Sequence, residues 1–201
     1  MPAGSHPTLT IGGVTLTLEV ERKRVKNVNA RLHGSHLRIS APLSIPTREL
    51  ERVVTELAAT LLRRRRGREI NRDGDLLEAA RRVAARFPEP PKVREISFST
   101  TQCARWGSYS AATGTVRVHA ALASMPRWVR ESVIAHELTH AFHRDHSAAF
   151  WKLLRSVCPA VDRARTFLAG VSWLARRWDT LAPGERAQLH GGWTADEEGR
   201  E

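Results

Sequence analysis

The stretch from His136 to His146 reads HELTHAFHRDH, and it largely decides the organisation of this 201-residue chain. On a helix, His136 and His140 are one turn apart and project from the same face, so both imidazoles can reach one metal ion. Glu137 lies beside them, near the fourth coordination position of such an ion. This HExxH spacing predicts an open zinc site in which a carboxylate can deprotonate a bound water.

The third ligand must be chosen between His143 and His146. His143 would continue the same helical face, but it lies about 10.5 Å along the axis from His136, and three ligands on one straight helix fit a tetrahedral ion poorly. His146 is therefore the predicted third ligand, which requires the helix to end near residues 142–144 and the chain to turn back. Asp145 is a candidate turning residue, and its carboxylate is also a candidate to orient a ligand imidazole.

The flanks of this stretch carry signals for helix boundaries. Before it, Ser124 and Pro126 are typical of a helix start, with a capping hydroxyl and a proline in the first turn. After it, Ser147 is a candidate cap for a second helix, which Pro159 would stop. The metal-binding segment is therefore expected to connect two helices.

Four short motifs lie at and around the metal-binding stretch. They are RWGS at residues 105–108, HELTH at 136–140, His146-Ser147 and Phe150-Trp151. Together they resemble the YgjP-like metallopeptidase domain, a relative of the SprT-like zinc proteases, and the resemblance extends from about Thr8 to Trp178. It implies a zincin-like domain, a strand bearing the RWGS motif before the zinc helix, and protein or peptide substrates.

The chain departs from the pattern of that family at three positions. Tyr109 stands where the family usually carries cysteine, Ala104 where a serine commonly precedes the arginine, and Asp145 where asparagine often precedes the third histidine. These departures leave the zinc ligands unchanged and concern the shape of the substrate cleft.

Arg105 and Tyr109 are candidates to stabilise the oxyanion that develops during hydrolysis. A structural interpretation competes with this one, in which Arg105 only anchors its loop. The resemblance also implies that a strand at this place borders the cleft, as in zincin-type proteins, where it can hold an extended substrate by main-chain pairing. His119 is expected to be structural, and His33 and His36 flank a turn glycine and are expected to be exposed.

The fold class expected from hydrophobic periodicity is α+β, with a small N-terminal antiparallel sheet followed by a helical domain that has its own short sheet. The family resemblance implies that this helical domain is zincin-like. Three parts are expected: residues 1–70, a β-rich region plus a helix; residues 71–180, the zincin-like domain; and residues 181–201, a disordered tail.

The individual elements follow from the same patterns. Strands are expected at 9–11, 14–20, 25–28, 37–39, 93–100 and 115–119, and helices from Thr47, from Asp75 to Phe87 and from Val161 to Trp178. Thr47 is a candidate cap for the first helix, the arginines at 63–66 are expected to form its solvated end, and the last helix is expected to cover the back of the zinc domain.

Composition is that of a globular protein with a strong basic excess. The net charge is +11, which favours association with polyanions such as nucleic acids, although a general use of arginine explains it equally well. No apolar run approaches the length of a membrane span and no signal peptide is evident, so a cytoplasmic location without membrane association is expected. Cys103 and Cys158 form no CxxC pair and are expected to be reduced, buried thiols.

Three functions are compatible with these features. The favoured one is a zinc metallopeptidase, in which Zn²⁺ held by His136, His140 and His146 activates water and Glu137 acts as general base and acid. The second is a metal-dependent hydrolase of nucleotide phosphoanhydrides, with arginines holding the phosphates. The third is a non-catalytic basic module that binds nucleic acid and carries a structural metal, although structural zinc usually has four protein ligands. The sequence leaves the oligomeric state open.

Overall fold

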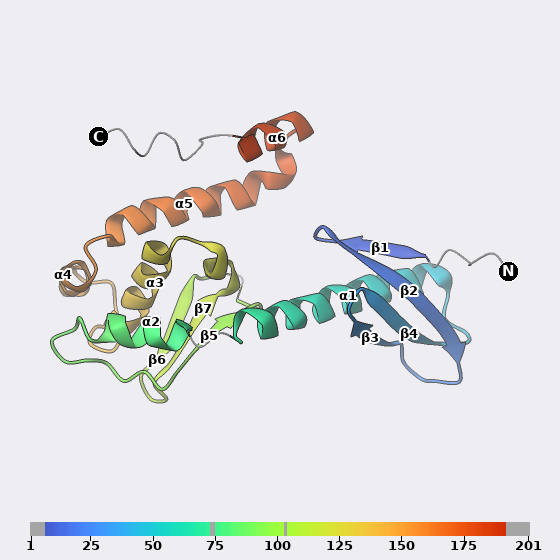
Figure 1. The fold of residues 1–201 in the computed structure, drawn as a ribbon, viewed down its shortest axis with the longest axis horizontal. Coiled ribbons are helices and arrows are strands. Elements are labelled where there is room, and N and C mark those ends of the chain that lie inside the picture. The colour runs from blue at the N-terminus through green and yellow to red at the C-terminus, as the bar shows by residue number, and fades with distance from the viewer. Residues whose placement is uncertain (1–6, 73–74, 103, 192–201) are drawn as a thin grey trace.

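The computed structural model describes residues 7–72, 75–102 and 104–191 (Figure 1). An N-terminal sheet of four strands consists of β1 (Thr8–Ile11), β2 (Val14–Lys23), β3 (Asn29–His33) and β4 (His36–Pro42). Gly12 and Gly13 form the two-residue turn between β1 and β2, and their φ angles of 54° and 78° are those that such a hairpin turn requires. The chain is α+β, as predicted.

The N-terminal sheet has the order β1-β2-β4-β3, and its pairings are antiparallel except that β2 and β4 are parallel. The expected sheet is therefore antiparallel in its two hairpins only. The two hairpins meet through β2 and β4, which are both interior strands, and β4 buries Leu37, Ile39 and Ala41 while β3 lies at the edge. The strand expected at 25–28 begins later, at Asn29.

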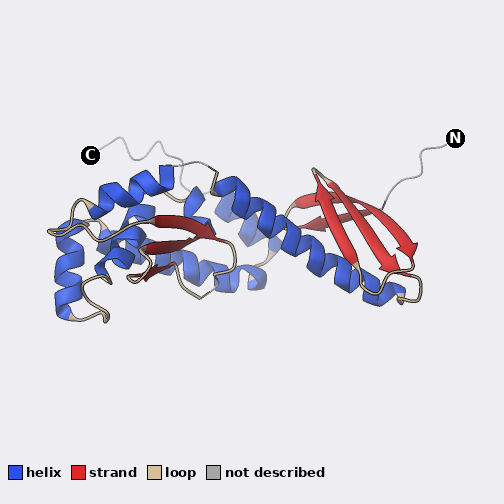
Figure 2. Cartoon of the chain, turned by 90° about the horizontal axis from the view of Figure 1, so that it is seen from below, coloured by secondary structure: helices blue, strands red, loops and turns tan. Residues whose placement is uncertain are grey.

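Helix α1 (Thr47–Ile70) connects this sheet to the rest of the molecule (Figures 1 and 2). Its first half buries Leu50, Val54 and Ala58 against the sheet. Pro46 is its N-cap residue and no side chain caps it, so the expected cap at Thr47 is wrong. The arginines at 63–66 lie within the helix and not at its end, because the helix continues for another turn.

Asn71 is the C-cap residue of α1, and its side chain forms hydrogen bonds with the second sheet. Its side-chain amide donates to the carbonyls of Gly67, at 2.7 Å, and Phe98, at 3.0 Å, and its Oδ1 accepts from the Phe98 amide at 2.7 Å. One side chain therefore caps a helix and pairs with a strand.

The second part contains three strands and the remaining helices. They are α2 (Asp75–Ala84), β5 (Glu95–Ser99), β6 (Gly107–Ser110), β7 (Thr115–His119), the 3₁₀ helix η1 (Ala120–Ser124), α3 (Arg127–Thr139), α4 (Ala148–Val157), α5 (Val161–Arg177), the 3₁₀ helix η2 (Trp178–Thr180) and α6 (Pro183–Gly191). The sheet order is β5-β7-β6, with β6 antiparallel to β7 at one edge. Strand β6 contains most of the RWGSYS segment, in agreement with the strand that the family resemblance implied.

Helix α3 lies at the centre of this part and contacts α2, α4, α5, β6 and β7. Its residues Val129, Ile134 and Leu138 are fully buried in a core that is separate from the one beneath the N-terminal sheet. Cys158 is a buried free thiol in this core, as expected, whereas Cys103 lies outside the described residues. The HELTH motif therefore begins on a helix that is buried over most of its length.

Residues 183–191 form helix α6, where the sequence predicted disorder, and residues 192–201 lie outside the described part. The helix begins at Pro183, and Glu185 accepts a hydrogen bond from the Ala182 amide at 2.7 Å, which satisfies a main-chain donor at the helix start. Among the described residues, no helix combines the length and the apolar character needed to cross a bilayer.

Candidate metal centre

Helix α3 carries His136 and Glu137 and ends at Thr139, with His140 as its C-cap residue. This end comes earlier than the sequence predicted. The amides of residues 140–142 bond to carbonyls three residues back, so the helix tightens into one 3₁₀-type turn.

The start of α3 also differs from the prediction. Pro126 is the N-cap residue and no side chain caps the helix. Ser124 is the last residue of η1 and lies too far back to reach the first turn of α3. The cap in this region belongs to η1, where Nδ1 of His119 accepts a hydrogen bond from the Ala121 amide at 3.1 Å, a structural role for His119 as expected.

The segment after α3 returns the chain so that His146 faces His136. Ser147 then caps α4, with its hydroxyl accepting from the Phe150 amide at 3.5 Å. Since α4 begins at Ala148, His146 is held between a helix start and a tight turn.

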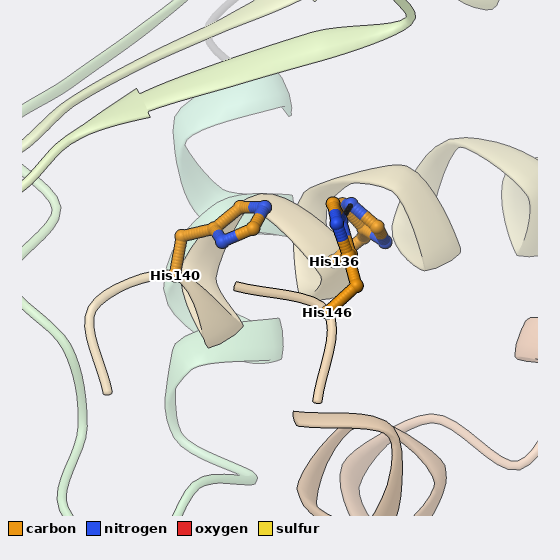
Figure 3. A group of neighbouring side chains, drawn as sticks. All are labelled: His136, His140 and His146. Atoms are coloured by element: carbon orange, nitrogen blue, oxygen red, sulfur yellow. Dashed lines mark hydrogen bonds between the residues drawn. The ribbon is translucent and has the colours of Figure 1, made fainter. Parts of the chain in front are cut away.

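The three imidazoles converge on one point (Figure 3). One ring nitrogen from each of His136, His140 and His146 lies within 4.8 Å of the others. The Nε2 atoms of His136 and His146 are 3.0 Å apart. Two nitrogens bound to a tetrahedral zinc ion at 2.0–2.1 Å would be about 3.3 Å apart, so the spacing of His136 and His146 is close to that of two ligands of such an ion.

The tautomer of His140 is fixed by the main chain. Its Nδ1 lies 3.0 Å from the carbonyl oxygen of His143. A carbonyl only accepts, so Nδ1 carries the hydrogen and Nε2 keeps a lone pair for a metal. His143 therefore contributes its backbone, and not its imidazole, to the site.

Two aromatic residues of α4 support the histidines. The ring of the fully buried Phe150 lies 5.0 Å from that of His136, 4.8 Å from that of His140 and 4.7 Å from that of His146, centroid to centroid. Trp151 stacks on His146 at 5.8 Å. The pKa of His136 is lowered to about 4, first by burial and then by the neighbouring imidazoles and Arg165, which favours the neutral, metal-binding form.

Glu137 is 7% exposed and lies next to Gly107 of β6. A Cβ atom at Gly107 would come within 2.5 Å of Glu137 Oε1 and 2.7 Å of its Cδ. Only glycine allows this approach, and an isolated glycine in a strand is the sequence signal for it. Burial raises the pKa of Glu137 to about 7, and the guanidinium of Arg105 opposes that rise.

These residues line an open cleft of about 1210 Å³. One wall consists of Arg105, Trp106 and strand β6, and the opposite wall is helix α5, which contributes Val161, Asp162, Ala164, Arg165, Thr166, Leu168, Ala169 and Ser172. The last long helix was expected to cover the back of the domain. It instead forms a wall of the cleft, which sequence periodicity does not reveal because periodicity shows only that a helix buries one face.

The structure separates the remaining candidates. Arg105 is exposed in the cleft and acts electrostatically on Glu137. Tyr109 also lines the cleft, but its hydroxyl donates to the carbonyl of Lys92 at 3.1 Å. Asp145 is exposed, and within the described ranges it has no hydrogen-bonding or ion-pairing partner, so nothing in the geometry directs it to a ligand imidazole.

Comparison with known proteins agrees with this site. Residues 72–170 match the model of a metallopeptidase domain, which places this part of the chain among the metal-dependent hydrolases. The family is the YgjP-like metallopeptidase domain, and residues 72–170 belong to it, as the sequence motifs indicated.

The crystal structure of the metallopeptidase zymogen of Pyrococcus abyssi abylysin is similar to part of this chain. The identity is 25%, the match covers 51% of this chain and 91% of that one, and the TM-score is 0.36. No curated protein matches the chain.

Proposed function

We propose that the protein is a zinc-dependent metallopeptidase. The observation that carries this proposal is the placement of a buried carboxylate, Glu137, beside three converging imidazoles at the floor of an open cleft. A site with three protein ligands and an accessible position is typical of catalytic zinc, whereas structural zinc usually has four protein ligands.

His136, His140 and His146 would hold the zinc ion. When bound, zinc supplies a Lewis acid and lowers the pKa of its water ligand toward 7. Glu137 takes the proton from the attacking water and transfers it to the amine that leaves. The close packing of Gly107 on Glu137 holds the carboxylate in place for both transfers.

Strand β6 and Arg105 would bind the substrate. Since β6 is an edge of its sheet and Gly107, Ser108 and Tyr109 line the cleft, an extended peptide can pair with its main chain. Of the two candidates for stabilising the oxyanion, Arg105 is favoured because the proton of Tyr109 is already donated to Lys92.

A comparison of Glu137→Gln with His146→Ala tests the proposal. Wild type is expected to contain one zinc ion per chain by elemental analysis and to cleave an unfolded protein. Glu137→Gln should retain zinc and lose at least about a hundredfold in rate, the usual scale for general acid–base catalysis, whereas His146→Ala should lose zinc. Full activity in Glu137→Gln, or full zinc occupancy in His146→Ala, would contradict the assigned roles.

Hydrolysis of phosphoanhydrides is a second candidate, favoured by the arginines at positions 105, 144 and 165 that line the cleft. Release of phosphate from nucleotides by wild type, lost in Glu137→Gln and without cleavage of any protein, would support it. The predicted association with nucleic acid stays a prediction, and salt-dependent retardation of a DNA duplex by the full chain would test it.

A further inference from the structure

Three arginines reach the cleft from three different elements. Arg105 lies in the loop before β6, Arg144 lies between the ligands His140 and His146, and Arg165 lies on α5. The cleft that these three arginines line also contains His136, Glu137, His140 and His146. Three positively charged side chains therefore share the cleft with the candidate metal site, whether or not a metal ion is bound.

The acidic side chains of the cleft do not cancel this charge. Among the described residues that line it, only Glu137 and Asp162 are acidic. Asp162 accepts from Nε of Arg155 at 2.8 Å and from Nη2 of the same arginine at 3.2 Å, both closer than its 3.4 Å contact with Arg165, and Arg155 does not line the cleft. Glu137 is buried beneath the cleft surface. The cleft thus presents a net positive surface to a substrate.

The three arginines differ in how far contacts with other side chains restrain their guanidinium groups. Arg165 lies 4.3 Å above the ring of Trp151 and 3.4 Å from an oxygen of Asp162, so its position is partly fixed. Arg105 and Arg144 are exposed, and in the part of the chain that the structure describes neither makes a hydrogen bond or ion pair. Such guanidinium groups can form paired hydrogen bonds with a carboxylate of a bound peptide.

We infer that the cleft selects polypeptide segments with acidic side chains close to the scissile bond, and that Arg144 is a determinant of this specificity. The inference rests on the proposed peptidase function. A peptide is favoured over a nucleotide as the anionic ligand because the same cleft is bordered by an edge strand that can pair with a main chain.

The test measures binding and cleavage separately. Three fluorescent peptides of one sequence, with Glu, Gln or Arg flanking the central bond, are titrated against zinc-loaded full-length Glu137→Gln protein by anisotropy. The Glu peptide is expected to bind about tenfold more tightly than the Gln peptide, and the Arg peptide most weakly, with the differences shrinking as salt increases.

Two charge reversals, each made in the Glu137→Gln background, separate the effect of Arg144 from the effect of the net charge. Arg144→Glu should weaken binding of the Glu peptide about tenfold and improve binding of the Arg peptide. Arg81→Glu changes the net charge equally but lies on the exposed surface of α2 outside the cleft, and it should change either affinity less than twofold. Unchanged zinc content in Arg144→Glu would show that the metal site is intact. Arg144→Gln should have an intermediate effect on the affinity for the Glu peptide.

Equal affinity for the three peptides, or equal effects of Arg144→Glu and Arg81→Glu, would overturn the inference. Displacement of the Glu peptide by lower concentrations of ATP than of unlabelled Glu peptide would also overturn it, in favour of a phosphate ligand. Failure of the proposed function looks different: wild type would then bind the Glu peptide selectively but cleave none of the three. Equal cleavage of all three peptides, without selective binding, would support the peptidase function and reject the inferred preference for acidic side chains.

Discussion

The position of Glu137 depends on Gly107, which leaves no space for a larger residue. Gly107→Ala would place a methyl group within 2.7 Å of three side-chain atoms of Glu137. We expect the carboxylate to be displaced and peptide hydrolysis to fall at least about tenfold, because a small error in the position of a catalytic group is costly. Zinc content, measured by elemental analysis, should be unchanged because the histidines are not touched.

A control for this substitution is Gly67→Ala, where the added methyl meets only Thr100 at an ordinary 3.5 Å. It should retain activity and gain a few tenths of a kcal/mol or more in stability, about the difference in helix propensity. If Gly107→Ala were as active as Gly67→Ala, the contact with Glu137 would not position the base.

At the scale of single residues, sequence and structure contributed different parts of the site. His136, Glu137, His140 and His146 could be placed from spacing, because helix periodicity and one turn bring together residues that are close in the chain. Gly107 lies far from Glu137 in the chain, and only the tertiary packing of β6 against α3 makes it part of the site. The acceptor for the Nδ1–H group of His140 was missed for another reason: a main-chain carbonyl has no signature in the sequence.

Glu131 is a second buried carboxylate of α3, and it serves stability. It accepts hydrogen bonds from Arg127 of the same helix at 2.6 Å and from Arg86 at 2.7 Å, and the second bond links α3 to the segment just after α2. Burial raises its pKa, but the two arginines outweigh burial and the net shift is downward. Glu131→Gln should destabilise the protein by about 1.5–3 kcal/mol, the range for hydrogen bonds to charged groups.

The pH dependence of this effect follows from the lowered pKa. A carboxylate with a lower pKa in the folded state stabilises it above its unfolded pKa, and this contribution is lost as pH falls through the folded value. The difference in unfolding free energy between wild type and Glu131→Gln, measured with urea, should therefore be largest at neutral pH. It should shrink as the pH falls below the ordinary pKa of glutamate. Glu78→Gln, an exposed member of a 3.8 Å pair, should show little effect at any pH. A difference for Glu131 that grew on acidification would contradict the assignment.

At the scale of elements, the junction between α1 and β5 depends on one amide side chain. Asn71→Asp would replace the donor to two carbonyls with a carboxylate at the negative end of a helix. We expect a loss of about 2–3 kcal/mol in unfolding free energy, since two buried or half-buried acceptors lose their partner and meet a like charge. Chemical denaturation followed by circular dichroism measures this loss.

Asn29→Asp is the matched substitution at an exposed site, where the amide donates only to the Asn27 carbonyl at 3.1 Å. It should change stability by less than about 0.5 kcal/mol. An equal loss at both positions would show that the charge itself, and not the junction, is responsible.

The elements themselves could be predicted from the sequence to different degrees. The amphipathic helices were found because their apolar spacing is local, with boundaries shifted where prolines and 3₁₀ turns replaced side-chain caps, as at Pro46 and Pro126. The parallel pairing of β2 with β4 and the role of α5 as a cleft wall depend on how elements are arranged in space. A pattern within one segment carries no information on that arrangement.

At the scale of the whole molecule, the two hydrophobic cores share no buried residue, so metal removal should affect them unequally. A ligand that binds only the folded state stabilises it by about 4 kcal/mol when its concentration is a thousandfold above Kd. Removal of zinc by a chelator should therefore lower the melting temperature of the part that contains α3, and leave that of the N-terminal sheet nearly unchanged.

The distribution of tryptophans allows the two parts to be observed separately. All six lie between residues 106 and 193, so tryptophan fluorescence reports on the metallopeptidase part alone, whereas circular dichroism reports on both. With chelator, the fluorescence transition should move to lower temperature and separate from the later part of the dichroism transition. A single transition that shifts as a whole would show that α1 couples the two cores into one cooperative unit.

The hydrogen bond from His140 to the carbonyl of His143 has a consequence for how this site can vary during evolution. Because the acceptor belongs to the main chain, mutation of the side chain at position 143 leaves it in place. The tautomer of His140, a proposed metal ligand, is thus set by the course of the backbone, and the side chain at position 143 can change without removing this hydrogen bond. The identity of the side chain at position 143 is therefore a poor guide to what this residue contributes, which is its main-chain oxygen.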